Sequence, residues 1–296
     1  MESRLCSRCK FAIERDQPLR FCPRCGAEYD GGEPVRIVID SIPVEIGGRF
    51  AAGDACNLYH CRESDRLGTS VFKIVRTAAA NAHLAHESKV LQKLFEADRE
   101  RSFTPLFPQS SSCIQYSDGE GALPRYGAIR RYAEEIRSPD ELYTLDEVCS
   151  AYPAGIDARD MAWMWRRVLS VLGFVHQAGF VHAAINSGHV LIEPRDHKLV
   201  IIGWSRTVRI GQQPRIPASD GRDWSMGARP AFDLGGGAAC MRRLLKPDSD
   251  YAILRHLGRA SESGDAWRLL ADFDRLIDAM WGPRSFRPFT MPPRGG

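Results

Sequence analysis

Hydrophobic and polar residues change their spacing along the chain, and this change predicts where strands and helices lie. From residue 35 onward, short apolar stretches are separated by polar and turn residues, which is typical of strands. These stretches read VRIVID, IPVEIGGRF, NLYHCR and TSVFKIV. From residue 78 the apolar residues follow helical spacing, and further helices are predicted over 160–176 and 265–280. Strands first and helices later predict an α+β fold with a small β-rich lobe and a larger helical lobe.

Composition limits the class of protein without naming a partner. The 296 residues allow one large domain with an appendage, and the apolar share of 44% is enough to bury a sizeable core. The net charge of +3 neither requires a nucleic-acid partner nor excludes one. No apolar run approaches the ~18 residues needed to cross a bilayer, so we expect no membrane association. The first residues lack the apolar core of a secretory signal, and we expect a cytoplasmic protein.

Four of the nine cysteines form two close pairs near the N-terminus. Two Cys-x-x-Cys turns can offer Zn²⁺ four thiolates in a tetrahedron, which leaves no open position for a substrate. The second pair reads Cys-Pro-Arg-Cys-Gly, and the arrangement resembles the zinc-ribbon family. This resemblance implies a structural zinc ion held by Cys6, Cys9, Cys22 and Cys25. Redox pairs or disulfides are the alternative, but thirty residues leave no room for the larger fold that a redox pair needs.

The other five cysteines are scattered, and an odd number over a long chain does not suggest a disulfide framework. We therefore expect these thiols to be reduced and mostly buried. They are Cys56, Cys61, Cys113, Cys149 and Cys240.

A strand and the helix after it carry a resemblance to protein kinases. The strand reads Val71-Phe72-Lys73-Ile74, and Glu87 follows fourteen residues later in the predicted helix. The resemblance implies that Lys73 stands where kinases grip the nucleotide's α- and β-phosphates, and that Glu87 holds this lysine by an ion pair. The alternative is a structural brace, because a buried charge needs its partner even when no nucleotide binds.

The glycine-rich loop that the resemblance implies is eroded. Of its three glycine positions only Gly53 is kept, while Ala51 and Cys56 occupy the others. Glycines allow backbone amides to approach phosphate, so their loss weakens this contact. Gly53 remains a candidate nucleotide-binding residue together with Lys73 and Glu87, but an ordinary hairpin turn over 52–54 explains it equally well.

The segment 179–192 resembles the kinase catalytic loop, but the positions that carry the chemistry are changed. Ala184 replaces the aspartate that accepts the substrate's proton, and His189 replaces the metal-binding asparagine. Farther on, Ile201 replaces the aspartate that holds Mg²⁺. A methyl group accepts no proton, isoleucine has no ligand atom, and imidazole suits Mg²⁺ poorly. The resemblance therefore implies no catalytic residues and argues against bound Mg²⁺, while ATP binding stays open.

Asp233-Leu234-Gly235 resembles a displaced metal-binding triplet. This triplet lies too far beyond His182 to match the spacing between the catalytic loop and the metal-binding triplet in kinases, and no strand precedes it. A helix is predicted over 236–245, and in kinases the corresponding helix opens with an aspartate that supports the catalytic loop's backbone. We therefore expect this supporting role for Asp233.

These features together predict a bilobal protein-kinase-like fold preceded by a small zinc-ribbon module. The ribbon covers residues 1–30, and a linker with a leading strand covers 31–44. The N-lobe covers 45–134 and the C-lobe 135–280. The last part, 281–296, is a basic, aromatic tail that could dock on its own domain or on a partner.

Three functions fit these residues. The one we favour is a catalytically inactive kinase-like protein, a pseudokinase, that acts as a scaffold or regulatory binding protein for protein partners. The first alternative is an atypical ATP-dependent serine/threonine kinase or other nucleotide-dependent transferase whose catalytic carboxylates come from other positions, with the candidates Asp196, Asp220 and Asp223. The second is a nucleic-acid-associated protein led by the ribbon, which requires one basic face that includes Arg4, Arg8, Arg20 and Arg24.

Overall fold

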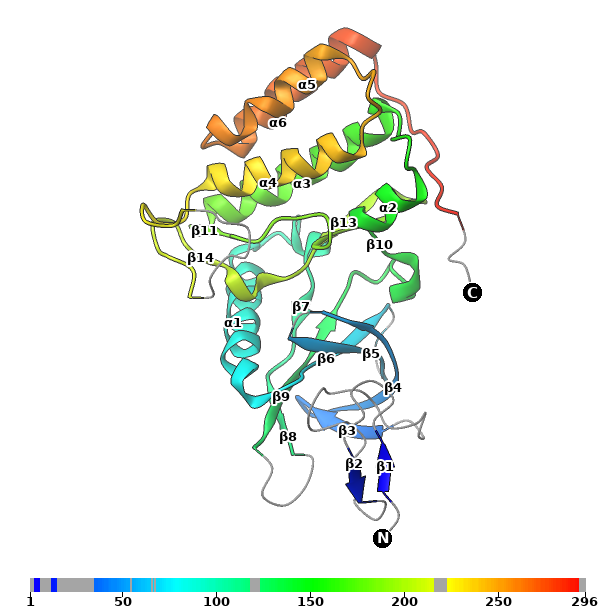
Figure 1. The fold of residues 1–296 in the computed structure, drawn as a ribbon, viewed down its shortest axis with the longest axis vertical. Helices are drawn as coiled ribbons and strands as arrows, with labels where there is room; N and C mark the ends of the chain where they lie inside the picture. Colours follow the sequence, from blue (N-terminus) through cyan, green and yellow to red (C-terminus); the bar gives the residue numbers. More distant parts are fainter. Residues whose placement is uncertain are drawn as a thin grey trace. The chain divides into compact units, whose positions relative to one another are not determined.

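The computed structural model describes residues 3–5, 12–14, 35–53, 55–64, 66, 68–117, 123–215 and 223–292. The chain divides into two compact units. Unit 1 comprises residues 1–93 and 109–139, and unit 2 comprises residues 94–108 and 140–296 (Figure 1). The first unit is rich in strands and the second in helices, as the order of the predicted elements indicates.

Two short strands pair antiparallel at the N-terminus. Strand β1 (Ser3–Leu5) pairs with β2 (Ala12–Glu14), and Leu5 lies opposite Ala12. The connection between them, residues 6–11, contains the first cysteine pair in its sequence. The four predicted zinc ligands lie outside the described residues, so the zinc site stays a prediction.

A seven-stranded antiparallel sheet forms the centre of unit 1, in the order β3-β4-β5-β6-β9-β7, with β8 also paired to β9. The leading strand that the sequence predicts is its first member. Short turns join most consecutive strands, which antiparallel pairing allows. The strands are β3 (Val35–Ile39), β4 (Ile42–Ala52), β5 (Cys56–Glu63), β6 (Ser70–Val75), β7 (Gln109–Ser110), β8 (Ile114–Tyr116) and β9 (Arg125–Arg131).

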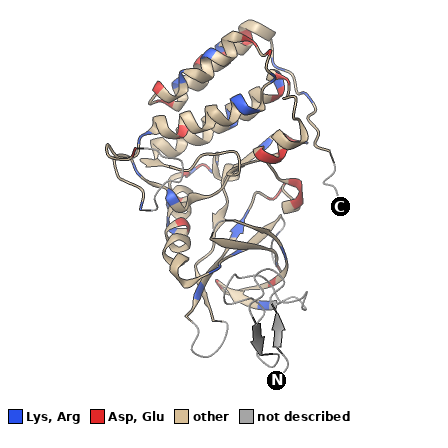
Figure 2. Cartoon of the chain, viewed as in Figure 1, with Lys and Arg blue, Asp and Glu red and all other residues tan. Residues whose placement is uncertain are grey.

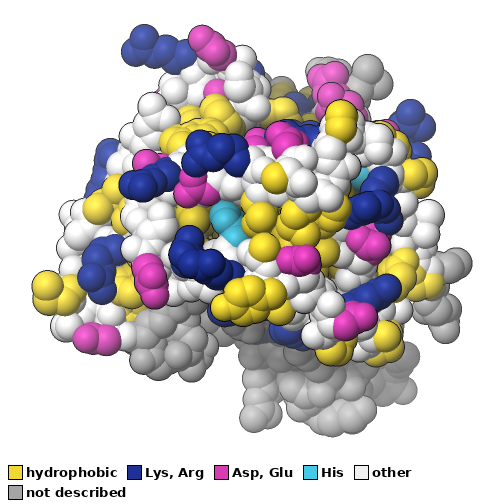
Figure 3. Space-filling view, turned by 90° about the horizontal axis from the view of Figure 1, so that it is seen from above, with side chains coloured by type: hydrophobic (Ala, Val, Ile, Leu, Met, Phe, Trp, Pro, Cys, Tyr) yellow, Lys and Arg dark blue, Asp and Glu magenta, His cyan; other side chains and the backbone are white. Residues whose placement is uncertain are grey.

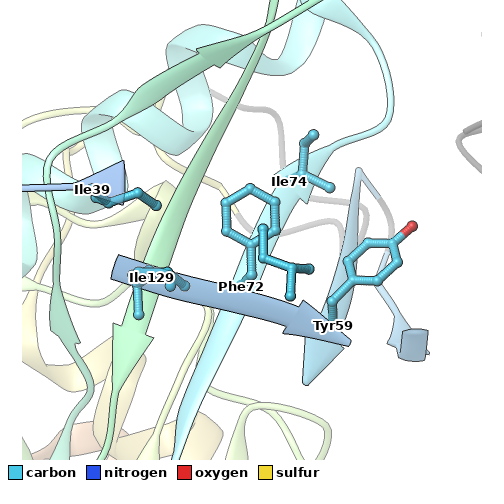
Figure 4. Close-up of a cluster of buried hydrophobic side chains, with 7 residues drawn as sticks. Ile39, Tyr59, Phe72, Ile74 and Ile129 are labelled. Atoms are coloured by element: carbon cyan, nitrogen blue, oxygen red, sulfur yellow. The ribbon is translucent and has the colours of Figure 1, made fainter. Parts of the chain in front are cut away.

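One apolar cluster of unit 1 is built from residues that alternate along these strands. Figure 4 shows Ile39, Tyr59, Phe72, Ile74 and Ile129 gathered in this cluster, each at most 3% exposed. Burying one such side chain stabilises the fold by about 1.5–3 kcal/mol. Because side chains of a strand alternate between its two faces, Phe72 and Ile74 commit Lys73 to the opposite face.

Helix α1 (Asn81–Ala97) supplies the partner for that opposite face. Its buried Leu84 packs with Val75 and Ala128 from the sheet, and Ala80 from the preceding turn joins them. This contact fixes α1 over β6 and β9. It therefore also fixes the polar residues that α1 directs toward the sheet.

Unit 2 is organised around helix α3 (Ala158–Gln177), whose side chains Trp165, Val168 and Leu172 are fully buried. Helix α4 (Pro230–Leu244) approaches it closely at Gly237, because a side chain there would come within 3.0 Å of the Trp165 ring. The remaining helices are α2 (Leu145–Ala151), α5 (Tyr251–Gly258) and α6 (Ala266–Trp281). No helix in the described part of the chain has the length and apolar character needed to span a membrane.

Small strands of unit 2 carry the loops of interest. Strands β12 (Val190–Glu193) and β13 (Lys198–Ile201) form a hairpin to which β10 (Tyr143–Thr144) adds a third strand. Strand β11 (Phe180–Val181) pairs with β14 (Val208–Arg209).

Two helices of unit 2 differ from the sequence-based prediction. Helix α4 begins at Pro230 instead of residue 236, so that Asp233 lies in its first turn. Proline is well tolerated at the first position of a helix, whereas the three glycines 235–237 hide the helical pattern. Helix α5 was not predicted, because its eight residues are too few to show a clear period.

The C-terminal tail docks on unit 2. Phe289 is buried, its ring lies 5.6 Å from that of Tyr152, and the Tyr152 hydroxyl donates a hydrogen bond to the Thr290 carbonyl. Arg287 donates to Asp160 over 3.2 Å. The described part of the tail therefore packs on its own domain, the first of the two options that the sequence left open. The five scattered cysteines are free, as predicted, although only Cys240 is buried.

Candidate functional site

Strand β6 and helix α1 bring Lys73 and Glu87 together in unit 1. The Lys73 Nζ atom lies 2.6 Å from Glu87 Oε2, and the carboxylate is 4% exposed. The ion pair that the kinase resemblance implies is therefore present. Its use by a nucleotide stays a prediction.

Arg130 is a third member of this cluster, and the sequence reasoning missed it. In the β6–β9 register Lys73 lies opposite Ala128 and Arg130 opposite Val71, so the lysine and the arginine share one face of the sheet. The Arg130 Nε atom lies 3.5 Å from Glu87 Oε1. Its guanidinium also donates to the hydroxyls of Ser110 and Ser88. The two-residue period along β9 is the signal that could have revealed it.

The charges of the cluster do not balance. Burial alone would raise the pKa of Glu87, but Lys73 and Arg130 outweigh it and lower this pKa to about 2. Glu87 is thus a carboxylate at neutral pH, between two cations. The three side chains together carry a net charge of +1.

Gly53, the third candidate of the nucleotide site, lies at the tip of the β4–β5 hairpin. Its N–H donates to the Cys56 carbonyl over 2.9 Å. A side chain at this position would meet nothing within 4 Å, so the fold itself does not require glycine here. The geometry is that of an ordinary hairpin connection, and phosphate binding by Gly53 stays a prediction.

Asp233 of α4 holds the backbone of the loop that resembles the catalytic loop. It accepts hydrogen bonds from the N–H groups of His182, over 2.7 Å, and Ala183, over 2.9 Å, while His176 Nε2 lies 3.0 Å from the same carboxylate. Ala183 has φ 63°, a left-handed conformation that costs a non-glycine residue about 1 kcal/mol. The expected supporting role of Asp233 is confirmed, and these bonds offset the strain.

The same hydrogen bonds keep Asp233 charged although it is fully buried. Burial raises its pKa, but the hydrogen bond and charge of His176, together with His182, lower this pKa below the ordinary value of 3.8. A buried charge held in this way is a structural element, because its lone pairs are occupied by the loop. It leaves no reason to assign a metal to Asp233.

The three degenerate positions, Ala184, His189 and Ile201, converge in unit 2. The His189 ring donates from Nδ1 to the Ala184 carbonyl over 2.7 Å. The His189 carbonyl accepts from Ile202 N–H over 2.9 Å, and Ile201 is completely buried at the end of β13. No carboxylate belongs to this cluster, and no group of three His, Cys, Asp or Glu residues in the described part of the chain could hold a metal ion.

The His189 ring also covers Gly203. A side-chain carbon on Gly203 would lie 2.7–2.8 Å from three atoms of the ring, and Gly203 itself has φ 83° and ψ 39°. Both the backbone and the histidine therefore require glycine at position 203. His189 itself stands where the kinase resemblance implies an asparagine that binds metal.

His182 and Trp204 brace the other side of this loop. The His182 Nε2 atom lies 3.0 Å from the Ile202 carbonyl, and the His182 and Trp204 rings meet edge to face at 4.5 Å. Trp204 Nε1 donates to the Ile201 carbonyl over 2.8 Å. These bonds hold the backbone around Ile201. The alkyl side chain of Ile201 has no atom that could bind a metal ion.

Two of the three carboxylates that the atypical-transferase alternative names lie in the described part of the chain. Asp196 belongs to the turn of the β12–β13 hairpin, and Ile201 lies at the opposite end of this hairpin. Three residues of β13, about 10 Å at ~3.3 Å per residue, already separate Ile201 from Lys198 at the turn end. The Asp223 carboxylate accepts from the N–H and hydroxyl of Ser225. Asp220 lies outside the described residues.

Comparisons with known proteins support the fold. No family model matches the chain, and no curated protein matches its sequence. Vaccinia related kinase 3 has a similar structure, with a TM-score of 0.65, 11% identity, and 85% of this chain and 94% of that chain covered. The BubR1 kinase domain is similar with a TM-score of 0.61, 10% identity, and 85% of each chain covered. At such identities the likeness shows a protein-kinase-like fold, with a β-rich N-terminal region and a helical C-terminal part.

Proposed function

We propose that this protein is a pseudokinase, a binding protein with a kinase-like fold that transfers no phosphoryl group. The observation that carries the proposal is the cluster of Ala184, His189 and Ile201 in unit 2. It holds a methyl group, an imidazole and a buried alkyl chain where phosphoryl transfer needs a proton acceptor and oxygen ligands for Mg²⁺.

The parts that support the loop are kept while the parts that react are lost. Asp233 still holds the loop through two backbone N–H groups, and Lys73 still pairs with Glu87. This pattern favours a fold retained for binding. We infer that the partners are proteins and that nucleotide binding survives in a residual form.

A structural zinc ion is a further part of the proposal. Cys6, Cys9, Cys22 and Cys25 supply four soft donors, the set that closed zinc sites use. Strand β1 ends at Leu5, directly before Cys6 in the sequence. When bound, zinc supplies folding energy to a segment too short for its own core. The module would offer a second contact surface.

Nucleic-acid binding stays an alternative, because the side chains of Arg4, Arg8, Arg20 and Arg24, which it requires, lie outside the described part of the chain. Figure 2 shows Lys and Arg interspersed with Asp and Glu along the described elements. On the face drawn in Figure 3, basic side chains again lie among acidic and hydrophobic ones. A continuous basic surface is what backbone recognition requires. The described side chains on this face do not provide one.

A phosphate-incorporation assay tests the proposal. Purified zinc-loaded protein is incubated with γ-labelled ATP, Mg²⁺ or Mn²⁺ and generic protein substrates, and the Lys73→Ala variant serves as the matched control. We expect both proteins to give the same background signal. Robust phosphate incorporation that disappears in Lys73→Ala would refute the pseudokinase proposal and favour the atypical transferase.

A further inference from the structure

Unit 1 holds one buried and one half-buried cation against a single buried carboxylate, and the predicted lysine–glutamate pair does not explain this surplus. Lys73 and Arg130 approach different oxygens of Glu87, over 2.6 Å to Oε2 and 3.5 Å to Oε1. One cation would neutralise the carboxylate. Because an uncompensated charge is costly away from water, the cluster favours a further anion beside it.

The two cations differ in their freedom to move. The Arg130 side chain is 3% exposed and is anchored by the hydroxyls of Ser88 and Ser110. The Lys73 side chain is 17% exposed, and its one acceptor among the described residues is Glu87. An ammonium has three donors, so Lys73 has two left for a ligand. Lys73 is therefore the cation that can turn to an incoming anion while Arg130 stays on Glu87.

We propose that Arg130 neutralises Glu87, so that Lys73 can bind the phosphates of a polyphosphate ligand, such as a nucleoside triphosphate, without a divalent metal ion. This inference rests on the residual nucleotide binding within the proposed function. In active kinases Mg²⁺ brings much of the positive charge that faces the phosphates. In this chain the fixed Arg130 guanidinium neutralises Glu87, so the positive charge of Lys73 remains available to the phosphates. Arg130 is a positioning residue, since it acts through Glu87 and Lys73.

Isothermal titration of the full, zinc-loaded chain with ATP, inorganic tripolyphosphate and adenosine tests the role of Arg130. The buffer is freed of Mg²⁺ with a chelating resin, and each titration is repeated with Mg²⁺ added. We expect ATP and tripolyphosphate to bind without Mg²⁺, and Mg²⁺ to tighten neither. Arg130→Met, which makes the cluster neutral, should weaken both at least about tenfold, whereas Arg130→Lys should keep most of the affinity because it keeps the charge.

The neighbouring arginine provides a matched control. Arg131 also pairs with a buried glutamate, Glu63, over 2.7 Å, but it projects from the other face of β9. Arg131→Met should leave binding of ATP and tripolyphosphate unchanged. A structural role alone predicts similar effects of the two variants on stability and none on anion affinity.

Three results would overturn the inference. The first is that the wild type binds ATP only when Mg²⁺ is present. The second is that adenosine binds as tightly as ATP while tripolyphosphate does not bind. The third is that Arg130→Met binds ATP and tripolyphosphate with wild-type affinity. If Arg130→Met does not fold, the inference is decided by whether ATP and tripolyphosphate binding to the wild type depends on Mg²⁺. Tripolyphosphate binding equal to that of ATP supports the inference and identifies the phosphate chain as the ligand. Phosphate incorporation refutes the proposed function, whereas missing metal-free binding refutes the role of Arg130 alone.

Discussion

Replacing Gly203 by alanine tests whether the His189 ring fills the space beside β13. The new side-chain carbon would lie 2.7–2.8 Å from three ring atoms, closer than carbon contacts allow. The backbone at Gly203 is also left-handed, with φ 83°. Two separate penalties therefore act at one position, and a second substitution can remove one of them.

The penalties can be worked out from the geometry. A left-handed alanine costs about 1 kcal/mol, and overpacking a rigid neighbour costs about 1–3 kcal/mol. Gly203→Ala should therefore lower the free energy of unfolding by about 2–4 kcal/mol. His189→Ala alone should cost about 1 kcal/mol, because it loses the hydrogen bond to the Ala184 carbonyl. In the double variant the overpacking is gone, so the combined cost should fall about 1–3 kcal/mol short of the sum.

Urea unfolding followed by tryptophan fluorescence measures these free energies. Gly211→Ala is the matched control, because Gly211 has φ 84° and a side chain there would meet nothing within 4 Å. It should show the backbone cost of about 1 kcal/mol by itself. Equal costs at positions 203 and 211, or additive costs in the Gly203–His189 double variant, would refute the packing of His189 on Gly203.

Other predictions follow from the buried polar groups and the cysteines. Asp233→Ala should lower the free energy of unfolding by about 3 kcal/mol, because the buried N–H of Ala183 loses its acceptor. Denaturant titration measures this free energy, and a cost below about 1 kcal/mol would contradict the role of Asp233. Burial lowers the pKa of His256, which accepts from Trp165, from 6.5 to about 4, so its contribution is complete above pH 6.5 and is lost as the pH falls toward 4. We expect a loss of about 2 kcal/mol over that window, reduced by partial solvent screening, and His256→Gln should flatten the pH dependence; an unchanged slope would exclude His256 as its source. Metal analysis should find one zinc ion per chain in the wild type and a loss in Cys22→Ser; zinc-free wild type with full stability would remove the zinc ribbon from the account.

Local patterns allowed much of this architecture to be predicted. The resemblance of the strand around Lys73 and the helix around Glu87 to those of protein kinases predicted an ion pair, and the structure confirms it. The support of the loop by Asp233 also followed from the sequence, although α4 begins six residues earlier than predicted. These features depend on residues close in sequence or on a familiar order of elements.

Contacts that depend on strand register or distant pairing could not be predicted in this way. Arg130 and Arg131 look alike in the sequence, and the pairing of β9 with β6 decides which of them faces Glu87. The ring of His189 lies over Gly203 because a loop and a later strand meet there, which no local pattern encodes. Docking of the tail through Phe289 is likewise a property of the folded chain.

The pseudokinase proposal is tested most directly by locating any metal ion in the folded protein. Crystals grown with a non-hydrolysable ATP analogue and Mn²⁺ would show any bound metal by its anomalous scattering. We expect no Mn²⁺ bonded to a side chain around Ala184, His189 and Ile201. A Mn²⁺ ion ligated by one of these side chains would contradict the pseudokinase proposal and identify a working metal site.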